Sequence, residues 1–190
     1  ATTAFVQDRI ETVIGNAGEA SSTGVELDGR ILISESLTLG GTLAFLNAEY
    51  DSYSAGPCNR SQSTRAGSLP GTCDLAGQAL PFAADSSASV YADILKPISD
   101  SLNLVANLTV SYSDEYFVEG TLEPTLIQDS WTKVSGRIGV EATDSSWSLA
   151  LMGQNLTDEE TWLGGQPLFG YDMVYPAAPR TITLQGTYKF

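Results

Sequence analysis

The sequence predicts an all-β protein: an antiparallel, up-and-down segment of a transmembrane β-barrel. Three observations predict this fold. Apolar and polar residues alternate with period two, tight and long connections alternate along the chain, and the net negative charge lies outside the strand segments. Period-two alternation is the spacing of a strand whose two faces meet different surroundings. Helical periodicity is not evident over any useful length of the chain.

The alternation predicts eight strands. They span residues 3–14, 23–33, 37–50, 86–97, 101–113, 131–142, 146–155 and 180–190. The second strand has apolar residues at Val25 and Leu27 opposed by Glu26 and Asp28. The sixth repeats this pattern, with Val134, Ile138 and Val140 against Lys133, Ser135, Arg137 and Glu141. In the last strand, Ile182, Leu184, Gly186 and Tyr188 alternate with Thr181, Thr183, Gln185 and Thr187.

Connections of two lengths join these strands. Three are tight and nearly copies of one another: Ser34-Glu35-Ser36, Ser99-Asp100-Ser101 and Asp144-Ser145-Ser146. The long connections are 15–22, 51–85, 114–130 and 156–179. Short turns at one end and long loops at the other are typical of outer-membrane barrels, whereas Greek-key sandwiches mix the two lengths at both ends. We therefore expect the four long connections to be external loops.

Aromatic residues are placed as interfacial belts would be. Trp147 and Tyr188 lie near the short-turn ends of the apolar faces, and Tyr112 and Trp131 lie toward the long-loop ends. Outer-membrane barrels carry such girdles at both interfaces.

Charge and composition exclude several functions. The 190 residues include 9 basic and 23 acidic side chains, for a net charge of −14, and no histidine. Nucleic acid is an unexpected partner, because binding it requires Lys and Arg to neutralise phosphates. Without histidine, Ser-His-Asp and Cys-His catalysis and His-containing zinc sites are impossible. We expect no enzyme, no catalytic residue, no metal site and no cofactor, because a barrel segment of this kind would supply wall and loops and not chemistry.

The two cysteines, Cys58 and Cys73, lie in a stretch rich in Gly, Ser, Pro and Thr. Their spacing is too wide for a CxxC redox or zinc pair, and a cysteine-only metal site needs four ligands. A loop disulfide and two unpaired thiols remain. The sequence favours the disulfide, because exposed free thiols in a flexible loop are uncommon, and this places the loop in an oxidising compartment.

Three motifs resemble a known family. Asn16-Ala17-Gly18 is followed by Ser22-Thr23-Gly24-Val25-Glu26-Leu27-Asp28, then Gln154-Asn155-Leu156-Thr157-Asp158-Glu159-Glu160-Thr161-Trp162, then Pro179-Arg180-Thr181 and a strand ending on Phe190. Their order and spacing are similar to those of the C-terminal barrel part of TonB-dependent outer-membrane receptors. The resemblance runs along most of the chain.

The resemblance implies that residues 1–190 are the C-terminal portion of a 22-stranded barrel. It implies an outer-membrane location in a Gram-negative bacterium, extracellular loops and energy-coupled import of a scarce nutrient such as a siderophore, chelate, vitamin or oligosaccharide. The implied partners are the rest of the barrel, its plug, TonB through an N-terminal box absent here, the barrel-assembly machinery, and outer-membrane lipid or lipopolysaccharide. Tyr188 and the terminal Phe190 would be the assembly signal. The chain begins at Ala1 without a methionine or an export signal, so we expect a mature or excised piece.

Aromatic residues in the long loops are the candidate ligand contacts. The last loop contains Trp162, Phe169, Tyr171 and Tyr175, and Tyr53 and Tyr116 are secondary candidates. Such side chains can stack on sugar rings or flat chelates, or they can pack the loops against one another. Loops 114–130 and 156–179 carry nine acidic residues and no basic one, which favours a neutral or cationic small-molecule or glycan ligand over an anion.

Three other interpretations stay open. A complete eight-stranded barrel would be a structural or adhesive protein. An outer-membrane hydrolase usually needs a histidine-based dyad or triad, so it fits poorly. A soluble β-sandwich binding module would show similar alternation, but it would not need detergent for extraction.

Overall fold

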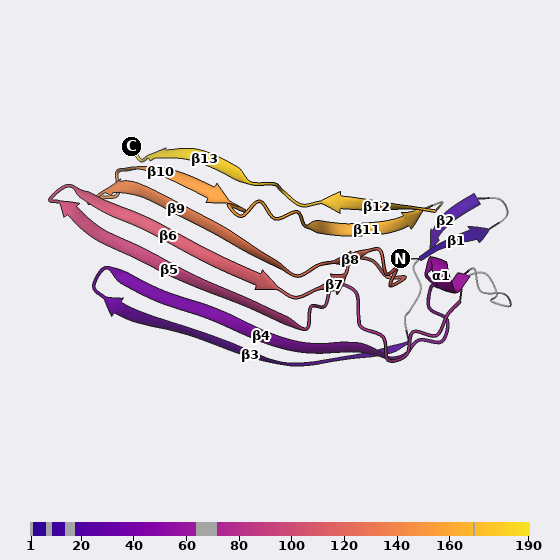
Figure 1. Ribbon diagram of the computed structural model, residues 1–190. Coiled ribbons are helices and arrows are strands. Elements are labelled where there is room, and N and C mark those ends of the chain that lie inside the picture. The colour runs from indigo at the N-terminus through magenta and orange to yellow at the C-terminus, as the bar shows by residue number, and fades with distance from the viewer. Residues whose placement is uncertain (1, 7–8, 14–17, 64–71, 169) are drawn as a thin grey trace.

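The computed structural model describes residues 2–6, 9–13, 18–63, 72–168 and 170–190. Within these residues, seven long strands form one continuous sheet, here named the wall (Figure 1). The strands are β3 (Glu19–Ser34), β4 (Leu37–Ser52), β5 (Ser86–Ser99), β6 (Leu102–Ser113), β9 (Trp131–Ala142), β10 (Trp147–Gln154) and β13 (Thr181–Tyr188). Their spatial order, β13-β10-β9-β6-β5-β4-β3, is their order along the chain.

Every neighbouring pair in the wall is antiparallel, which confirms the predicted all-β, up-and-down class. The wall is not closed: β3 and β13 are its outer strands among the described residues. It therefore matches neither a closed eight-stranded barrel nor a sandwich of two packed sheets.

The prediction of a wall strand at 3–14 is wrong. These residues form β1 (Thr2–Val6) and β2 (Arg9–Val13), which pair with each other as an antiparallel hairpin. Alternation identifies extended chain but not its partner, and a hairpin satisfies the backbone hydrogen bonds of both halves locally. The predicted connection 15–22 is also shorter than expected, because β3 already begins at Glu19.

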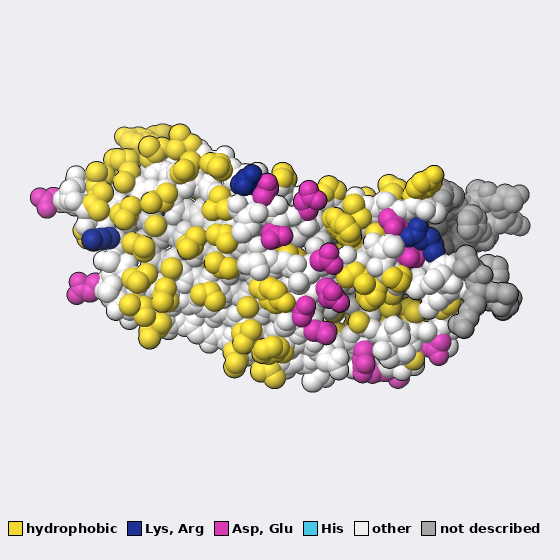
Figure 2. All heavy atoms as spheres, in the orientation of Figure 1, with side chains coloured by type: hydrophobic (Ala, Val, Ile, Leu, Met, Phe, Trp, Pro, Cys, Tyr) yellow, Lys and Arg dark blue, Asp and Glu magenta, His cyan; other side chains and the backbone are white. Residues whose placement is uncertain are grey.

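The register separates an apolar face of the wall from a polar face. One cross-strand row on the apolar face runs through Leu37, Ile94, Ala106, Ile138, Leu151 and Leu184. The adjacent row contains Thr38, Asp93, Asn107, Arg137, Met152 and Thr183 and points the other way. Asn107 Nδ2 donates to Asp93 Oδ1 at 2.7 Å on this polar face. Figure 2 shows apolar side chains spread over the wall and acidic ones gathered toward the long connections.

Lys96 and Trp131 depart from the division into an apolar and a polar face. Lys96 lies on the apolar face, paired with Leu104, close to the short-turn end of β5. Trp131 was expected in an apolar belt, but its register partner is Ser113, so it shares the polar face with Lys133. There the Lys133 ammonium lies 4.8 Å from the centre of the Trp131 ring. The parity of the register, fixed along the whole strand, decides the face.

The three tight turns are confirmed, and they share one local bond. The Ser36 N–H donates to Ser34 Oγ, and the Ser101 N–H donates to Ser99 Oγ. In the third turn, Ser146 N–H donates to Asp144 Oδ1. Short Ser and Asp side chains mimic a backbone turn in this way, which explains why the three sequences are near copies.

The long connections contain short elements of their own. These are α1 (Arg60–Ser63), β7 (Tyr116–Phe117), β8 (Ile127–Gln128), β11 (Trp162–Leu168) and β12 (Tyr171–Pro176). They gather at the end of the wall opposite the tight turns, and this group of segments is here named the loop layer (Figure 1). The most deeply buried side chains, Leu75, Val118 and Leu126, lie there and not in the wall. No described helix has the length and apolar character needed to cross a membrane.

Candidate functional site

The loop layer has an apolar core of its own. Tyr50, Leu75 and Leu122 form a buried cluster, and Tyr53, Leu80 and Phe117 pack against it. These residues come from the end of β4 and from the connections 53–85 and 114–130. The connections therefore form a packed structure instead of independent flexible loops.

Cys58 and Cys73 form a disulfide, as predicted, with their Cα atoms 5.1 Å apart. Backbone bonds reinforce the crosslink: Gly56 N–H donates to Cys73 O at 2.9 Å, and Cys73 N–H donates to Gly56 O at 2.7 Å. The chain segment that leads into α1 is thus anchored covalently and by a two-way backbone bridge.

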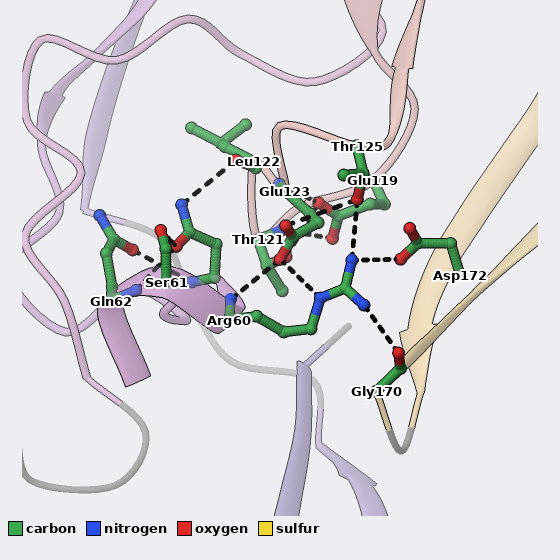
Figure 3. Close-up of polar contacts among 11 residues, drawn as sticks. Arg60, Ser61, Gln62, Glu119, Thr121, Leu122, Glu123, Thr125, Gly170 and Asp172 are labelled. Carbon is green, nitrogen blue, oxygen red and sulfur yellow. Dashed lines mark hydrogen bonds and ion pairs between the residues drawn. The ribbon is translucent and has the colours of Figure 1, made fainter. Parts of the chain in front are cut away.

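Arg60, at the start of α1, joins three connections (Figure 3). Its Nη2 contacts Asp172 Oδ1 at 2.7 Å and Thr125 Oγ1 at 2.8 Å, and its Nη1 donates to Gly170 O at 3.1 Å. Its Nε lies 3.3 Å from Glu123 Oε2, and its backbone N–H donates to the same oxygen at 2.9 Å. We name this set of contacts the Arg60 clasp.

A second carboxylate shapes the turn that presents Glu123. The Glu119 carboxylate accepts hydrogen bonds from Thr121 N, Thr121 Oγ1 and Glu123 N at 2.6, 2.8 and 2.7 Å. Leu122 adopts a left-handed backbone conformation, φ 55°, in this turn while its side chain is buried. Packing in the apolar cluster offsets the cost of that conformation.

The charges of the clasp stabilise one another. The pKa of Arg60 is raised, first by its hydrogen bond to Asp172 and then by Glu123. The pKa of Asp172 is lowered, first by the Thr125 hydroxyl and then by the Arg60 guanidinium. Part of the acidic excess counted in 114–130 and 156–179 is therefore neutralised by an arginine from a different connection.

The β11–β12 hairpin presents aromatic side chains on one face. Side chains alternate between the two faces of β12. Asp172 points toward Arg60, so residues 171, 173 and 175 lie on the opposite face. Tyr171 is 78% exposed and Tyr175 is 49% exposed. The opposite face of the hairpin docks on the loop layer, where a Cβ at Gly165 would meet Leu126 and Val118 at 3.0 and 3.1 Å.

The other predicted ligand contacts are placed differently. Tyr53 packs against Tyr50 with ring centres 5.2 Å apart, and the Tyr116 ring lies 6.5 Å from that of Phe82. Trp162 is partly buried, and its backbone N–H donates to Gln128 Oε1 at 2.7 Å. Phe169 lies outside the described residues. The structure thus brings Tyr171 and Tyr175 together on one exposed strand face, whereas Tyr53 and Tyr116 take part in loop packing.

Sequence reasoning missed Arg60. The distribution of charge could have indicated it. The connections 114–130 and 156–179 contain acidic residues and no basic one, so a basic residue in 51–85 is a candidate to pair with them. Within the described part of the chain, no group of three or more His, Cys, Asp or Glu residues is arranged to hold a metal ion.

The family model for the β-barrel of TonB-dependent receptor-like proteins matches residues 1–156. The chain belongs to this family. Because the family comprises receptors and not enzymes, the prediction that the chain is not an enzyme is confirmed. Members are proteins of the Gram-negative outer membrane that work with a plug domain, TonB and a ligand. No curated protein sequence gives a match.

Solved receptors have the same fold at low sequence identity. The ferric yersiniabactin uptake receptor FyuA from Yersinia pestis is 18% identical, with a TM-score of 0.72 over 92% of this chain. The siderophore receptor PiuA from Acinetobacter baumannii is 16% identical, with a TM-score of 0.64 over 90%. The ferric preacinetobactin receptor BauA from the same species is 19% identical, with a TM-score of 0.57 over 98%. The chain spans 24, 22 and 24% of these three proteins.

Proposed function

We propose that this chain is the C-terminal part of the barrel of an energy-coupled receptor that imports a siderophore-type metal chelate. The wall would span the outer membrane with its apolar face toward lipid, and the loop layer would lie outside the cell and capture the ligand. The proposed ligand class rests on one observation, the exposed face of β12 that presents Tyr171 and Tyr175. Aromatic rings of this kind stack on the flat, ring-bearing ligands that chelates provide.

The wall supports the proposed orientation. A charged side chain facing lipid at the bilayer centre costs about 2–4 kcal/mol for Lys or Arg, so charges belong on the lumen side. Arg30, Lys133 and Arg137 lie on the polar face. Lys96 is the exception, and its position near the tight-turn end lets its ammonium reach the interface while its stem stays apolar.

The loop layer supports a neutral or cationic ligand. Arg60 neutralises part of the negative charge of the connections 114–130 and 156–179, and Arg180 pairs with Asp158 at 3.0 Å. An excess of acidic side chains remains in these connections. At physiological ionic strength this field extends about 8 Å, so it repels anions at the mouth of the barrel. The solved receptors for ferric yersiniabactin and ferric preacinetobactin make a metal chelate the leading candidate.

The remaining roles follow from the same proposal. The polar face of the wall would meet a plug domain, and TonB would act on that plug from the inner membrane. The barrel-assembly machinery would recognise the end of β13 at Tyr188 and Phe190, and the rim of the loop layer would meet lipopolysaccharide.

Uptake by the full-length receptor tests the ligand class. A receptor-deletion strain would be complemented with wild type, Tyr171→Ala or Tyr53→Phe and given radioactive iron as the neutral tris-tropolonate complex or as a triply anionic tris-catecholate. We expect import of the neutral complex only, a several-fold loss with Tyr171→Ala, and wild-type uptake with Tyr53→Phe, because Tyr53 lies in the packed cluster. Import of the tris-catecholate complex alone, or equal uptake of the neutral complex with Tyr171→Ala, would contradict the proposal.

The same strains can be compared at low and high salt. Binding of a neutral chelate should change little, because it does not depend on long-range charge. An anionic ligand whose binding weakens steeply as salt is added would show that the charge argument is wrong.

A further inference from the structure

We propose that Arg60 is a positioning residue for Tyr171 and that the Cys58–Cys73 disulfide presents Arg60 to the β11–β12 hairpin. This inference rests on the proposed function only for its consequence, which is a fixed aromatic surface for ligand capture. The clasp itself can be tested without any ligand.

Arg60 contacts the residues on both sides of Tyr171. Its Nη1 donates to Gly170 O at 3.1 Å, and its Nη2 contacts Asp172 Oδ1 at 2.7 Å (Figure 3). Tyr171 lies between these two anchor points and is itself 78% exposed. An exposed side chain is fixed mainly through its backbone, and here a single guanidinium holds the Gly170 carbonyl on one side of Tyr171 and the Asp172 carboxylate on the other.

The clasp differs from an ordinary exposed ion pair. Exposed pairs contribute little because water competes for both partners. Here the planar guanidinium makes several directed bonds, a geometry that a lysine could not reproduce. The Glu123 side chain is only 6% exposed, whereas those of Arg60 and Asp172 are 34% and 27% exposed. Loss of Arg60 would therefore leave the Glu123 carboxylate buried without its cation, in addition to releasing the hairpin.

The disulfide and Asn59 determine where Arg60 lies. Cys58 precedes Arg60 by two residues and is linked to Cys73. Between them, Asn59 Oδ1 accepts a hydrogen bond from Gln62 N at 3.0 Å and so caps α1. Asn59 Nδ2 reaches Leu122 O at 3.4 Å in the neighbouring connection. The crosslink, the cap and the guanidinium thus form one chain of contacts from a covalent anchor to Tyr171.

Hydrogen exchange of the full-length receptor in detergent tests the clasp. We would compare wild type with Arg60→Ala, Arg60→Lys and Arg180→Ala. Arg180→Ala is the matched control, because Arg180 also binds a carboxylate, that of Asp158, which lies outside the hairpin. In Arg60→Ala, amides of 170–176 should exchange about tenfold faster, which corresponds to a tenfold shift of the local equilibrium. Arg60→Lys should keep part of the wild-type protection of these amides, and Arg180→Ala should keep all of it. Exchange in β6 and β9 should be unchanged in every variant.

A Cys58→Ser/Cys73→Ser variant tests the role of the disulfide. It should raise exchange in 170–176 in the same way, and adding Arg60→Ala to it should raise exchange little further, because both changes break the same chain of contacts. Wild-type exchange of 170–176 in Arg60→Ala would overturn the clasp. Wild-type exchange in the double serine variant would overturn the role of the disulfide.

Binding of iron(III) tris-tropolonate to the same variants separates this inference from the proposed function. If Arg60→Ala loosens the hairpin and weakens binding about tenfold, while adding it to Tyr171→Ala weakens binding no further, Arg60 acts through Tyr171. Loosening of the hairpin in a receptor that binds no neutral chelate would contradict the proposed ligand class and leave the clasp supported. If the receptor binds the neutral chelate but exchange of the hairpin is unchanged in Arg60→Ala, the proposed ligand class is supported and the clasp is contradicted.

Discussion

Asn155 occupies a left-handed backbone conformation, φ 49°, at the end of β10, and its side chain is buried. Its Nδ2 donates to Glu159 O at 2.9 Å and Ala178 O at 3.4 Å, and its Oδ1 accepts from Glu159 N at 3.0 Å. Asp158 contacts Arg180 at 3.0 Å. The Asn-Leu-Thr-Asp and Pro-Arg motifs that carry the family resemblance therefore tie the end of β10 to the start of β13.

Replacing Asn155 tests this tie at the residue scale. Asn155→Ala removes a buried amide and its hydrogen bonds. It also leaves alanine in the left-handed region, where no side-chain hydrogen bond offsets the strain. We therefore expect a loss of about 2–4 kcal/mol of local stability. Asn155→Gly should cost about 1 kcal/mol less, because glycine tolerates this φ. Hydrogen exchange across 155–160 and 178–181 measures both. Equal costs for the two variants would show that the backbone conformation carries no strain.

The Arg60 clasp should depend on pH through Asp172. The folded-state pKa of Asp172 is lowered, first by Thr125 and then by Arg60. Its stabilising contribution is therefore fully present above the unfolded value of about 3.9 and is lost as pH falls through the lower folded value. Pepsin, which is active in this range, should cleave the β11–β12 hairpin slowly at pH 5 and readily near pH 2.

Asp172→Asn is the control for this titration. It should make the hairpin equally accessible at both pH values once pepsin activity is normalised on an unstructured peptide. A wild-type hairpin whose relative cleavage does not change with pH would show that another contact holds it in place.

At the scale of elements, the docking of the β11–β12 hairpin depends on a close approach at Gly165. Its N–H donates to Val118 O at 3.1 Å, and Leu126 and Val118 leave little room for a side chain there. Leu126 and Val118 are almost fully buried. The loop layer thus has the dense packing of a protein core, and its glycine lets two backbones meet.

A volume swap tests this docking. Gly165→Ala should cost about 1–3 kcal/mol, because its Cβ would press on buried side chains. Leu126→Ala should cost about 2–5 kcal/mol by leaving a cavity. The double variant should cost less than the two single costs added together, because the new methyl group partly fills the space. Denaturant-dependent protease resistance of 162–176 measures all three, and strictly additive costs would mean that the side chains do not compete for one space.

Elements with strong local signals could be predicted from sequence, and those that depend on partners could not. The wall strands have period-two alternation, and the tight turns have Ser or Asp at the bonding position, so both are encoded within a few residues. Alternation predicts a wall strand where β1 and β2 form a hairpin, because the pattern does not identify a pairing partner. The face of Trp131 followed from a register with β6 that no local pattern reveals.

The candidate site was predicted only in part for the same reason. The disulfide could be predicted from the sequence, because the chain has only two cysteines. The sequence places Tyr53 and Tyr116 among the candidate ligand contacts, since it does not distinguish a loop that packs from one that extends into solvent. Arg60 acts on residues more than sixty positions away, Glu123 and Asp172, and such contacts exist only once the connections have assembled.

At the scale of the whole molecule, the end of the chain lies against the tight-turn side of the wall. Lys189 N–H donates to Ser146 O at 2.8 Å, which continues the pairing of β13 with β10. The Phe190 ring lies 5.9 Å from that of Tyr188, and its side chain is fully exposed. In the finished fold, Phe190 therefore contributes little packing to the part of the chain that is described.

Phe190 should therefore matter more for assembly than for stability. A single aromatic side chain at the interface adds at most about 1.5–3 kcal/mol of burial, which is small for a large barrel. Deleting Phe190 or changing it to Ala should sharply lower the amount of receptor in the outer membrane, whereas Phe190→Trp should keep it near wild type. Receptor that does assemble should have wild-type thermal stability and wild-type exchange in β10 and β13. Surface quantification and melting of the purified receptor measure the two effects separately. Normal surface levels after deletion would contradict the assembly role, and a lowered melting temperature with normal levels would assign Phe190 to the fold instead.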